Sequence, residues 1–490
     1  MTITKSDFNT GKQCEKRLWL SRHQPSLGTP ATDSLDRRAE DGIKVGQLAR
    51  LYYPGGHLID WSDEEVEVQT QNAITRGVDC LYEAAFRVEG EDLFVRCDIL
   101  RQISGTSNEW HLIEAKSGTS VRPDYITDVA FQTNALRAAG LTVSKVAILH
   151  VNNHYLYDGG EYDPISLFTE ADVTSEVDAQ IDSIRVSVKK LISILEQPEP
   201  PNVETNRHCA DPPCEFHDHC HSHQPEHDVI QLPRITAKQV TVYRKAGYRS
   251  IGDIPVQHLK PQWTTIWNVV RSGVPHYGPT IGAVLARIQY PLHFIDFESV
   301  ACALPLYPHT RPYQQILFQW SNHILHTPGD TLRHEEFLHT DNSDPRSAFA
   351  DSLWKSVKDA GTIVVYSSFE ASRLRELAND GIPWGAELSN KLDACALDIL
   401  KVVKDHVYHP AFKGSYSVKT VLPALVPELS YAGLPIHDGD TASLRFLEMQ
   451  GLRASEQAPK EIAANLLEYC GLDTLAMVRI FERLIQASAG

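Results

Sequence analysis

The sequence predicts an α/β protein with several domains, in which two sheet-forming regions flank a helical connector. Its length of 490 residues corresponds to roughly three domains at about 150 residues each. Short runs rich in β-branched and aromatic residues alternate with amphipathic helical patterns in both regions. A Pro-rich run at 197–202 and a polar stretch at 221–228 mark the first boundary. We therefore expect domains at 1–225, 226–289 and 290–490.

The composition narrows the class of protein. Lys and Arg total 46 against 63 Asp and Glu, and the resulting formal charge of −17 excludes a polybasic nucleic-acid coat but not a local basic groove. Hydrophobic residues make up 42% and charged residues 22%, which is typical of a folded chain. The first 22 residues lack the apolar core of a signal peptide, and no 18 uncharged apolar residues follow one another. These features predict a cytoplasmic protein without membrane contact.

The N-terminal region contains three successive strand patterns, then a helix, then a strand of nearly continuous apolar residues. Such a strand is typical of a sheet that is covered on both faces. A short helix is expected to begin near Ser6, where apolar residues recur at helical spacing. The predicted strands are 81–86, 93–100, 110–115 and 143–151, and the predicted longer helix is 128–139.

The connector over 231–289 has a helical pattern, and residues 243–255 have the rhythm of a helix-hairpin-helix-like piece. It could contact phosphate groups, or it could be a spacer with a solvated charged face, and both interpretations stay open. Its basic residues are Lys238, Arg244, Lys245 and Arg249. In the C-terminal region we expect strands at 292–297, 316–323 and 362–366, and helices at 347–359, 371–380 and 461–486.

The first group of residues suited to chemistry lies on adjoining strands. Glu114 and Lys116 are two residues apart, so both side chains point to one face, and Asp98 on the neighbouring strand can reach the same place. Two carboxylates can hold Mg²⁺ or Mn²⁺, and a lysine can offset charge that develops on a phosphodiester. Gln132 lies on the following helix, one turn after Asp128, where its amide could orient the lysine. An ordinary ion pair between Glu114 and Lys116 is the alternative.

Roughly residues 1–225 resemble the PD-(D/E)xK nucleases, and specifically the RecB-like iron–sulfur branch that includes the CRISPR-associated exonucleases. In that branch one cysteine precedes the nuclease core and three follow it, as Cys14 precedes and Cys209, Cys214 and Cys220 follow here. The resemblance implies a restriction-endonuclease-like fold and a [4Fe–4S] cluster on these four thiolates. It also implies that the two acids, the lysine and the glutamine described above are catalytic, with the acids as metal ligands.

Zinc is the alternative occupant of the cysteine site, because four cysteines with nearby histidines could also form a tetrahedral centre. The intervals between the late cysteines are looser than the tight pairs usual in zinc ribbons, which favours iron–sulfur. The neighbouring histidines are His208, His217, His219 and His221.

Two positions depart from the pattern of this nuclease branch. Gln47, in the predicted helix over 42–49, stands where a metal-binding histidine is expected. Leu136 stands where a tyrosine commonly follows the helix glutamine. Glu83 is a further candidate ligand. These departures bear on metal affinity and on the direction of cutting.

The second group of residues lies in the C-terminal region. Asp296 and Glu298 alternate on an apolar strand, which places both carboxylates on one face. Glu370 lies where a strand meets a helix, and Tyr469 lies one turn before Asp473 in the last predicted helix. Taken alone, Tyr469 and Asp473 could be an ordinary pair on a helix surface.

Together these residues, over about 290–488, resemble the RNase H-like DEDD exonucleases, whose four acids bind two metal ions. The resemblance implies that the four acids named above are metal ligands and that Tyr469 positions the attacking water. Glu370 departs from the family, which has aspartate there, and Asp393 is a substitute candidate. The combination of both regions resembles a bacterial family of fused nucleases.

One further segment, over 412–422, could hold substrate phosphates. Its candidate side chains are those of Lys413, Ser415, Ser417 and Lys419. Ser417 could also be the N-cap of a helix over 418–425, and the two roles are compatible.

These observations predict a metal-dependent nuclease with two hydrolytic sites that act on DNA, on single strands or ends, in DNA repair or in defence against foreign DNA. A nucleic-acid-binding adaptor with a lapsed C-terminal site and an RNA-processing exonuclease are the alternatives. Any nucleic-acid groove is expected to be local and to use Lys16, Arg17, Arg22 and the basic residues of the connector.

Overall fold

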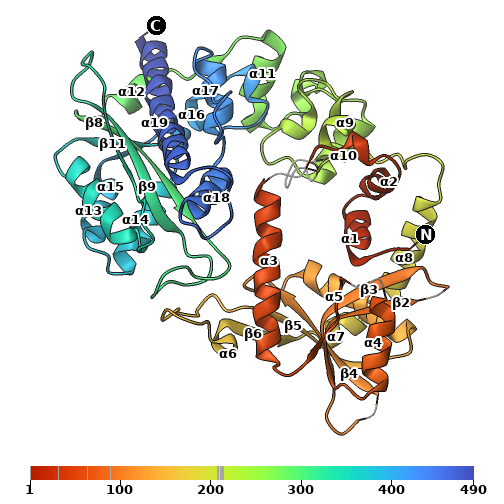
Figure 1. The fold of residues 1–490 in the computed structure, drawn as a ribbon. Coiled ribbons are helices and arrows are strands. Elements are labelled where there is room, and N and C mark those ends of the chain that lie inside the picture. The colour runs from red at the N-terminus through yellow and green to blue at the C-terminus, as the bar shows by residue number, and fades with distance from the viewer. Residues whose placement is uncertain are drawn as a thin grey trace. The chain divides into compact units, whose positions relative to one another are not determined.

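The computed structural model describes residues 2–30, 33–62, 65–88, 90–106, 108–206, 209 and 214–489 (Figure 1). The chain forms two compact units. The first comprises Met1–Ser222 with Cys302–Gln314, and the second comprises His223–Ala301 with Gln315–Gly490. Both units combine a mixed sheet with helices, so the expected α/β multidomain class is confirmed.

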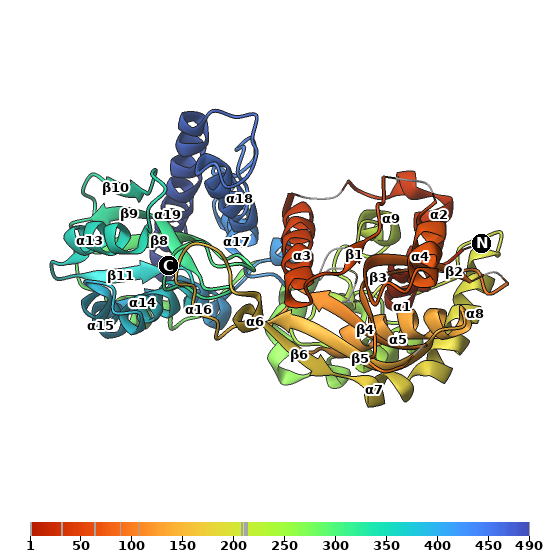
Figure 2. The same ribbon diagram turned by 60° about the horizontal axis from the view of Figure 1, so that its bottom comes forward.

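The first unit is built on a six-stranded sheet with the strand order β1-β2-β3-β4-β5-β6 (Figure 2). The strands β2, β3 and β4 form an antiparallel meander, β5 pairs parallel to β4, and β6 closes the sheet antiparallel. The predicted strands are confirmed with slightly wider bounds. The strands are β1 His57–Leu58, β2 Cys80–Val88, β3 Leu93–Gln102, β4 Glu109–Lys116, β5 Thr142–Val151 and β6 Phe168–Asp172.

Helix α5 packs on this sheet and carries the predicted glutamine. Its residues 128–136 are all buried, because the helix lies between the sheet and helices α1, α7 and α8. The predicted helix near Ser6 is α1, and a second helix follows directly after Cys14. The helices are α1 Lys5–Gln13, α2 Glu15–His23, α3 Asp33–Tyr52, α4 Val66–Thr75, α5 Pro123–Ala138, α6 Pro164–Leu167, α7 Thr174–Asp178, α8 Ile181–Leu195 and α9 His217–His221, with a 3-10 turn at Pro25–Leu27.

A distant segment, Cys302–Gln314, also belongs to the first unit although it links two strands of the second. The Tyr157 N–H donates to the Thr310 carbonyl oxygen at 3.1 Å, and the Tyr162 hydroxyl donates to that of Pro305 at 2.9 Å. The Tyr313 hydroxyl donates to the Ser117 carbonyl oxygen at 2.8 Å. The expected domain boundaries at 225 and 290 did not place this segment in the first unit, because these hydrogen bonds join residues far apart in sequence.

The second unit contains a five-stranded sheet with the strand order β10-β9-β8-β11-β12. The strands β8, β9 and β10 are antiparallel neighbours, whereas β11 runs parallel to both β8 and β12. A small two-stranded sheet pairs β7 with β13. The strands are β7 His276–Tyr277, β8 Leu292–Val300, β9 Ile316–Leu325, β10 Arg333–Leu338, β11 Thr362–Val365, β12 Ala396–Asp398 and β13 Val407–Tyr408.

Helices cover both faces of the five-stranded sheet (Figure 1). On one face, Phe297 and Val365 pack against helices α13, α14 and α15; on the other, Phe294 and Val364 pack against α19. The face that meets α19 also bears Asp296 and Glu298, because side chains alternate along β8. The helices are α10 Ala237–Lys245, α11 Thr264–Ser272, α12 Ile281–Leu285, α13 Arg346–Val357, α14 Phe369–Asn379, α15 Gly385–Cys395, α16 Ile399–His406, α17 Val418–Leu425, α18 Gly439–Met449 and α19 Pro459–Ala489, with 3-10 turns at Val229–Gln231, Ile251–Asp253, Val256–His258, Pro261–Trp263 and Pro410–Phe412.

The predicted connector is helical, but it belongs to the second unit and shares one hydrophobic core with it. Trp263 of the connector lies in the same buried cluster as Phe294 of β8 and Phe481 of α19. The basic residues expected to contact phosphate differ in exposure: Lys238, Lys245 and Arg249 are exposed, whereas Arg244 is buried. The interpretation of Arg244 as a phosphate contact is therefore wrong, because its guanidinium is taken up by Asp228 inside the unit.

Replacing Arg244 with alanine is expected to destabilise the second unit strongly. The Arg244 Nη2 lies 3.2 Å from the Asp228 Oδ2, and both side chains are 3% exposed. The substitution would leave the Asp228 carboxylate buried without its cation, a change that typically costs about 3–5 kcal/mol. The measurement is the free energy of unfolding in urea. The exposed residue Lys238, on the same helix, provides the control, and an equal effect of Lys238→Ala and Arg244→Ala would contradict the prediction.

Among the described residues, no helix combines the length and the apolar composition that a membrane span requires.

Candidate metal centres

The first acidic cluster lies where two strands of the first unit separate. The antiparallel pairing of β3 with β4 ends at Ile99 and Ile113, and Asp98 and Glu114 follow just beyond this point. The Ala115 N–H donates to the Asp98 Oδ2 at 2.9 Å, which holds the carboxylate against the neighbouring strand. The expected proximity of the two acids thus rests on the local register of the meander.

The Glu114 carboxylate is buried and receives three donors. The ammonium groups of Lys5 and Lys116 lie 2.5 Å and 3.1 Å from its Oε1, and the Gln132 Nε2 donates to its Oε2 at 2.7 Å. Burial by itself would raise the pKa of Glu114, but the two ammonium groups and the hydrogen bonds outweigh burial and lower the pKa to about 2. Glu114 is therefore ionised throughout the physiological range.

Asp98 differs from Glu114 because, within the part of the chain that the structure describes, no ammonium group forms an ion pair with it. Burial and the neighbouring charge of Glu114 raise the pKa of Asp98 to about 7. Lys116 also donates to the Asp128 Oδ2 at 2.6 Å. Burial by itself would lower the pKa of Lys116, but the charges of Glu114 and Asp128 raise it. Near neutral pH the cluster thus has one acid that readily gives up its proton and a lysine that stays charged.

The remaining residues considered for this site lie elsewhere or are neutralised. Glu83 sits opposite the break in the β2–β3 pairing with a positive φ of 60°, and its two carboxylate oxygens are taken by Arg50 and Arg96. Gln47 is exposed on α3, and Leu136 is fully buried in the core. Glu83 therefore lacks a free oxygen for a cation in this arrangement.

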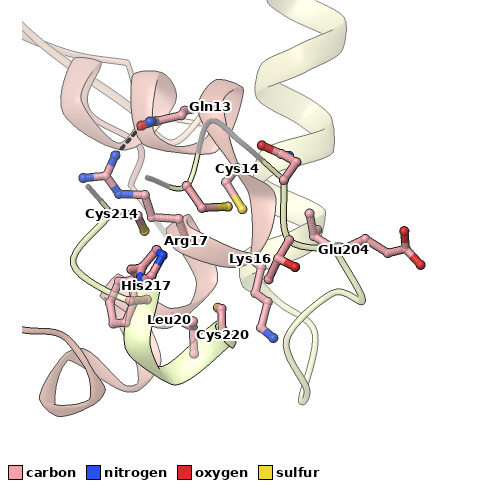
Figure 3. A pocket seen from close by; sticks show the side chains of 14 residues that line it. Gln13, Cys14, Lys16, Arg17, Leu20, Glu204, Cys214, His217 and Cys220 are labelled. Atoms are coloured by element: carbon pink, nitrogen blue, oxygen red, sulfur yellow. Dashed lines mark hydrogen bonds between the residues drawn. The ribbon is translucent and has the colours of Figure 1, made fainter. Parts of the chain in front are cut away.

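The four cysteines singled out in the sequence line one cavity of the first unit (Figure 3). Cys14 lies between α1 and α2, Cys220 lies on α9, and Cys209 and Cys214 precede α9. The cavity measures about 50 Å³, several times the roughly 10–15 Å³ that a single water needs. Helix α2 also lines the cavity, so the start and the end of the unit meet there.

Charged residues of both signs line this cavity. Lys16 and Arg17 supply cations, Glu204 supplies an acid, and His217 also lines it, whereas His208 lies outside the described residues. Burial raises the pKa of Cys214, and the charge of Arg17 acts in the opposite direction. Burial also raises the pKa of Cys220, where the charge of Lys16 acts in the opposite direction. Among the described residues, no three of the four sulfur atoms lie within 4.8 Å of one another.

The second acidic cluster lies between β8 and α19. One carboxylate oxygen each of Asp296 and Glu298 and the Cys470 Sγ all lie within 4.8 Å of one another. The register of β8 against β9 shifts directly after Glu298, and such bulges commonly redirect side chains next to a site. Burial and the charge of Asp473 raise the pKa of both Asp296 and Glu298 well above the ordinary range.

Asp473 approaches these acids from α19 and is held by a tyrosine that the sequence did not indicate. The Tyr431 hydroxyl donates to the Asp473 Oδ1 at 2.5 Å. Burial raises the pKa of Asp473 to about 6, while Tyr431, Lys419 and Tyr469 counteract this rise. Tyr469 is buried beside Tyr431, with 6.3 Å between the ring centroids, so both tyrosines lie at this acid.

Glu370 completes the cluster from the first turn of α14. It is 2% exposed, and burial together with the charges of Asp398 and Asp473 raises its pKa to about 8. Asp393, the proposed substitute, is exposed and pairs with Arg375 at 2.5 Å on the surface. The substitute interpretation is wrong for Asp393, because its side chain is exposed and paired at the surface. Asp398 at the end of β12 is a nearer acid, since its charge acts on Glu370.

Positive charge at the second cluster comes from α17. The charge of Lys419 acts on both Glu298 and Asp473, and its Nζ lies 5.6 Å from the centre of the Tyr469 ring. The expected helix is confirmed as α17 with Ser417 as its N-cap residue, although the Ser417 side chain makes no capping bond. Lys413 is placed beside Glu226, with 3.5 Å between the charged groups.

Four residues at these sites were missed by sequence reasoning: Lys5, Asp398, Tyr431 and Cys470. The predicted helix near Ser6 could have indicated Lys5, because a helix that packs on the sheet brings its first turn close to the strands. Asp398 ends an apolar strand, a position typical of site residues in parallel sheets. No local pattern marks Tyr431. Cys470 was interpreted as a small buried residue, and it is indeed buried, but that interpretation did not anticipate the neighbouring acids.

The fold and these clusters define an α/β protein of two units. In each unit, strands of the sheet carry buried acids. Residues 293–417, which include three acids of the second cluster, match a family described as "Domain of unknown function (DUF2779)". An "Uncharacterized protein MG366 homolog" from Mycoplasma pneumoniae is 28% identical over 230 residues, which is 41% of this chain and 33% of the relative. An "Uncharacterized protein UU173" from Ureaplasma parvum serovar 3 is 24% identical over 224 residues, which is 40% of this chain and 31% of the relative. The chain thus spans about a third of the length of these relatives.

Proposed function

We propose that this protein is a metal-dependent nuclease that hydrolyses phosphodiester bonds of DNA, on single strands or ends. The observation that carries the proposal is the cluster of four acids in the second unit, Asp296, Glu298, Glu370 and Asp473. Each is buried or nearly so, and burial raises the pKa of each. Neighbouring acids add to this rise for Asp296, Glu298 and Glu370. Lys419 is a cation that acts on Glu298 and Asp473, and the pKa of both acids is raised in spite of it.

Buried carboxylates that repel one another are costly unless a cation is bound between them. Carboxylate oxygens are the preferred ligands of Mg²⁺ and Mn²⁺. Two such ions, when bound, would stabilise the attacking and the leaving oxygen of an in-line displacement at phosphorus. The chemistry of the donor set therefore fits the metal ions that the RNase H-like resemblance implies.

The chain's own residues have distinct tasks in this proposal. Tyr431 holds the Asp473 Oδ1 by a hydrogen bond, and Tyr469 also stabilises the ionised Asp473 carboxylate. Tyr469 is placed to orient the attacking water. Lys419 is placed to bind a phosphate oxygen of the substrate.

Both proposed sites lie on a sheet, where the strands hold side chains in fixed positions. The second unit has a five-stranded sheet in the order β10-β9-β8-β11-β12, and its strand β8 bears Asp296 and Glu298. The first unit has an antiparallel meander followed by a helix and a parallel strand, with acids on β3 and β4. We propose Asp98 and Glu114 as ligands of a second metal centre, with Lys116 and Gln132 as its other functional residues.

The test is the degradation of labelled single-stranded DNA, double-stranded DNA and RNA by the full chain with Mg²⁺ or Mn²⁺. Metal-dependent loss of DNA supports the proposal, and exclusive loss of RNA favours the RNA-processing alternative. Binding without cleavage of any substrate would favour the adaptor alternative. Repair and defence against foreign DNA are both proposed roles for such an activity.

We further propose that the four-cysteine cavity holds a [4Fe–4S] cluster, with zinc as the alternative. A zinc ion bound by thiolates at about 2.3 Å brings sulfur atoms within about 3.8 Å of one another. Four thiolates around one cavity also suit a [4Fe–4S] cluster, and the loose sequence intervals between the late cysteines favour it over zinc. Cys14 on one side and Cys209, Cys214 and Cys220 on the other would then fasten the two ends of the unit together.

The protein is accordingly expected to be brown when purified without oxygen, with an absorbance shoulder near roughly 400 nm and bound iron. Cys209→Ala should remove the shoulder and most of the iron, because one of four ligands is lost. Cys395→Ala, in the second unit, is the matched control and should keep both. A colourless protein with one equivalent of zinc would refute the iron–sulfur assignment.

A further inference from the structure

Lys5 lies in the first acidic cluster although 109 residues separate it from the acid that it contacts. Its Nζ is 2.5 Å from the Glu114 Oε1. The Glu114 side chain is 2% exposed and the Lys5 side chain 28% exposed, so the contact is screened from water on the side of the acid. The contact brings the beginning of the chain into the predicted metal site.

The backbone around Lys5 is held firmly against the sheet. The Ile3 N–H donates to the Asp92 carbonyl oxygen at 2.7 Å, and the Phe94 N–H donates to that of Ile3 at 3.1 Å. Thr4 then caps α1, and its partner in a complete capping box is Asp7. Because Lys5 is the first residue of this capped helix, its position is set by the fold and its side chain projects to Glu114.

The three donors at Glu114 differ in how easily a cation could replace them. Gln132 donates to the Oε2, whereas both ammonium groups lie against the Oε1, so a cation that binds the Oε1 must displace an ammonium group. Lys116 and Lys5 share that oxygen, but Lys116 also bonds Asp128 at 2.6 Å. The Lys5 ammonium contacts a single carboxylate within the described part of the chain, and its side chain can swing to solvent.

We propose that Lys5 is a tethered cation that occupies the metal position on Glu114 and leaves it when a divalent cation binds. This inference rests on the proposed metal centre of the first unit and adds a residue to it. In the metal-free protein Lys5 keeps the buried carboxylate neutralised, so the site stays formed. Metal binding must then displace one ammonium group, which lowers the apparent affinity for the ion.

The test measures Mn²⁺ binding by the loss of the free Mn²⁺ signal in electron paramagnetic resonance. It uses the full chain with Asp296→Asn and Glu298→Gln, which silence the second cluster. Lys5→Met keeps the aliphatic stem but removes the charge, and we expect Mn²⁺ to bind about tenfold more tightly because the competing charge is gone. Lys5→Arg retains a cation and should stay within about twofold of the parent.

Controls separate this inference from the proposed function. Lys12→Met alters an exposed lysine of the same helix and should leave Mn²⁺ binding unchanged. Equal or weaker binding by Lys5→Met, with an unchanged circular dichroism spectrum, would overturn the tethered-cation role alone. If Asp98→Asn leaves the Mn²⁺ binding of the parent unchanged, the first cluster binds no metal, and both the inference and the proposed centre in this unit fall.

Discussion

Asp296→Asn is expected to slow hydrolysis at the second acidic cluster by about a thousandfold, which corresponds to about 4 kcal/mol of transition-state stabilisation. The carboxylate lies at the centre of the cluster, next to Glu298 and Cys470, and its charge is coupled to Asp473 and Glu370. An amide of the same size keeps the packing but removes the charge that a divalent cation requires. The rate is measured on labelled DNA in an Asp98→Asn background, so that the first cluster does not contribute.

The fold provides a matched control for this substitution. Asp393→Asn removes an acid of the same unit that pairs with Arg375 at the surface, and it should leave the rate within about twofold, since exposed ion pairs contribute little. Asp296→Asn should also raise the stability of the metal-free protein, because it removes a buried carboxyl that must take up a proton on folding. An undiminished rate in Asp296→Asn would remove the second cluster from the catalytic assignment.

The metal-free protein is expected to lose stability as the pH rises from about 5 to 8 and to regain it when Mg²⁺ or Mn²⁺ is added. Burial, together with the charges of Asp398 and Asp473, raises the pKa of Glu370 from 4.5 to about 8. Burial raises the pKa of Asp473 from 3.8 to about 6. The folded state therefore holds protons that the unfolded state has already released, and stability falls with pH over this interval. For Glu370 the full effect is of the order of 5 kcal/mol at about 1.4 kcal/mol for each pKa unit.

Urea unfolding of the second unit at several pH values, with EDTA or with Mn²⁺, measures this dependence. Glu370→Gln should flatten the pH profile in EDTA and weaken the response to Mn²⁺, because the titrating group is gone. Glu387→Gln changes an exposed acid of the neighbouring helix α15 and should leave both unchanged. A metal-free stability that rises between pH 5 and 8 would contradict the raised pKa values on which the proposed metal site depends.

The elements that carry the two acidic clusters were predictable from local pattern alone. Side-chain alternation on a strand placed Asp296 and Glu298 on one face, and the strands over 81–86, 93–100 and 110–115 were each found within a few residues. Hydrophobic periodicity is a property of the local sequence, so it predicts an element without knowledge of what packs against that element. The division of the chain was less predictable, because the connector and the segment Cys302–Gln314 are assigned by contacts between residues far apart in sequence.

Local pattern was sufficient to predict the α/β class, most of the longer strands, and the acid and cysteine types present at the candidate centres. Long-range packing set which of these residues meet. Lys5 contacts Glu114, Tyr431 contacts Asp473, the four cysteines line one cavity, and Arg244 and Asp393 lie away from the proposed chemistry. The physical reason is that pattern fixes which face of an element a side chain occupies, whereas the neighbour on that face is set by long-range packing and charge.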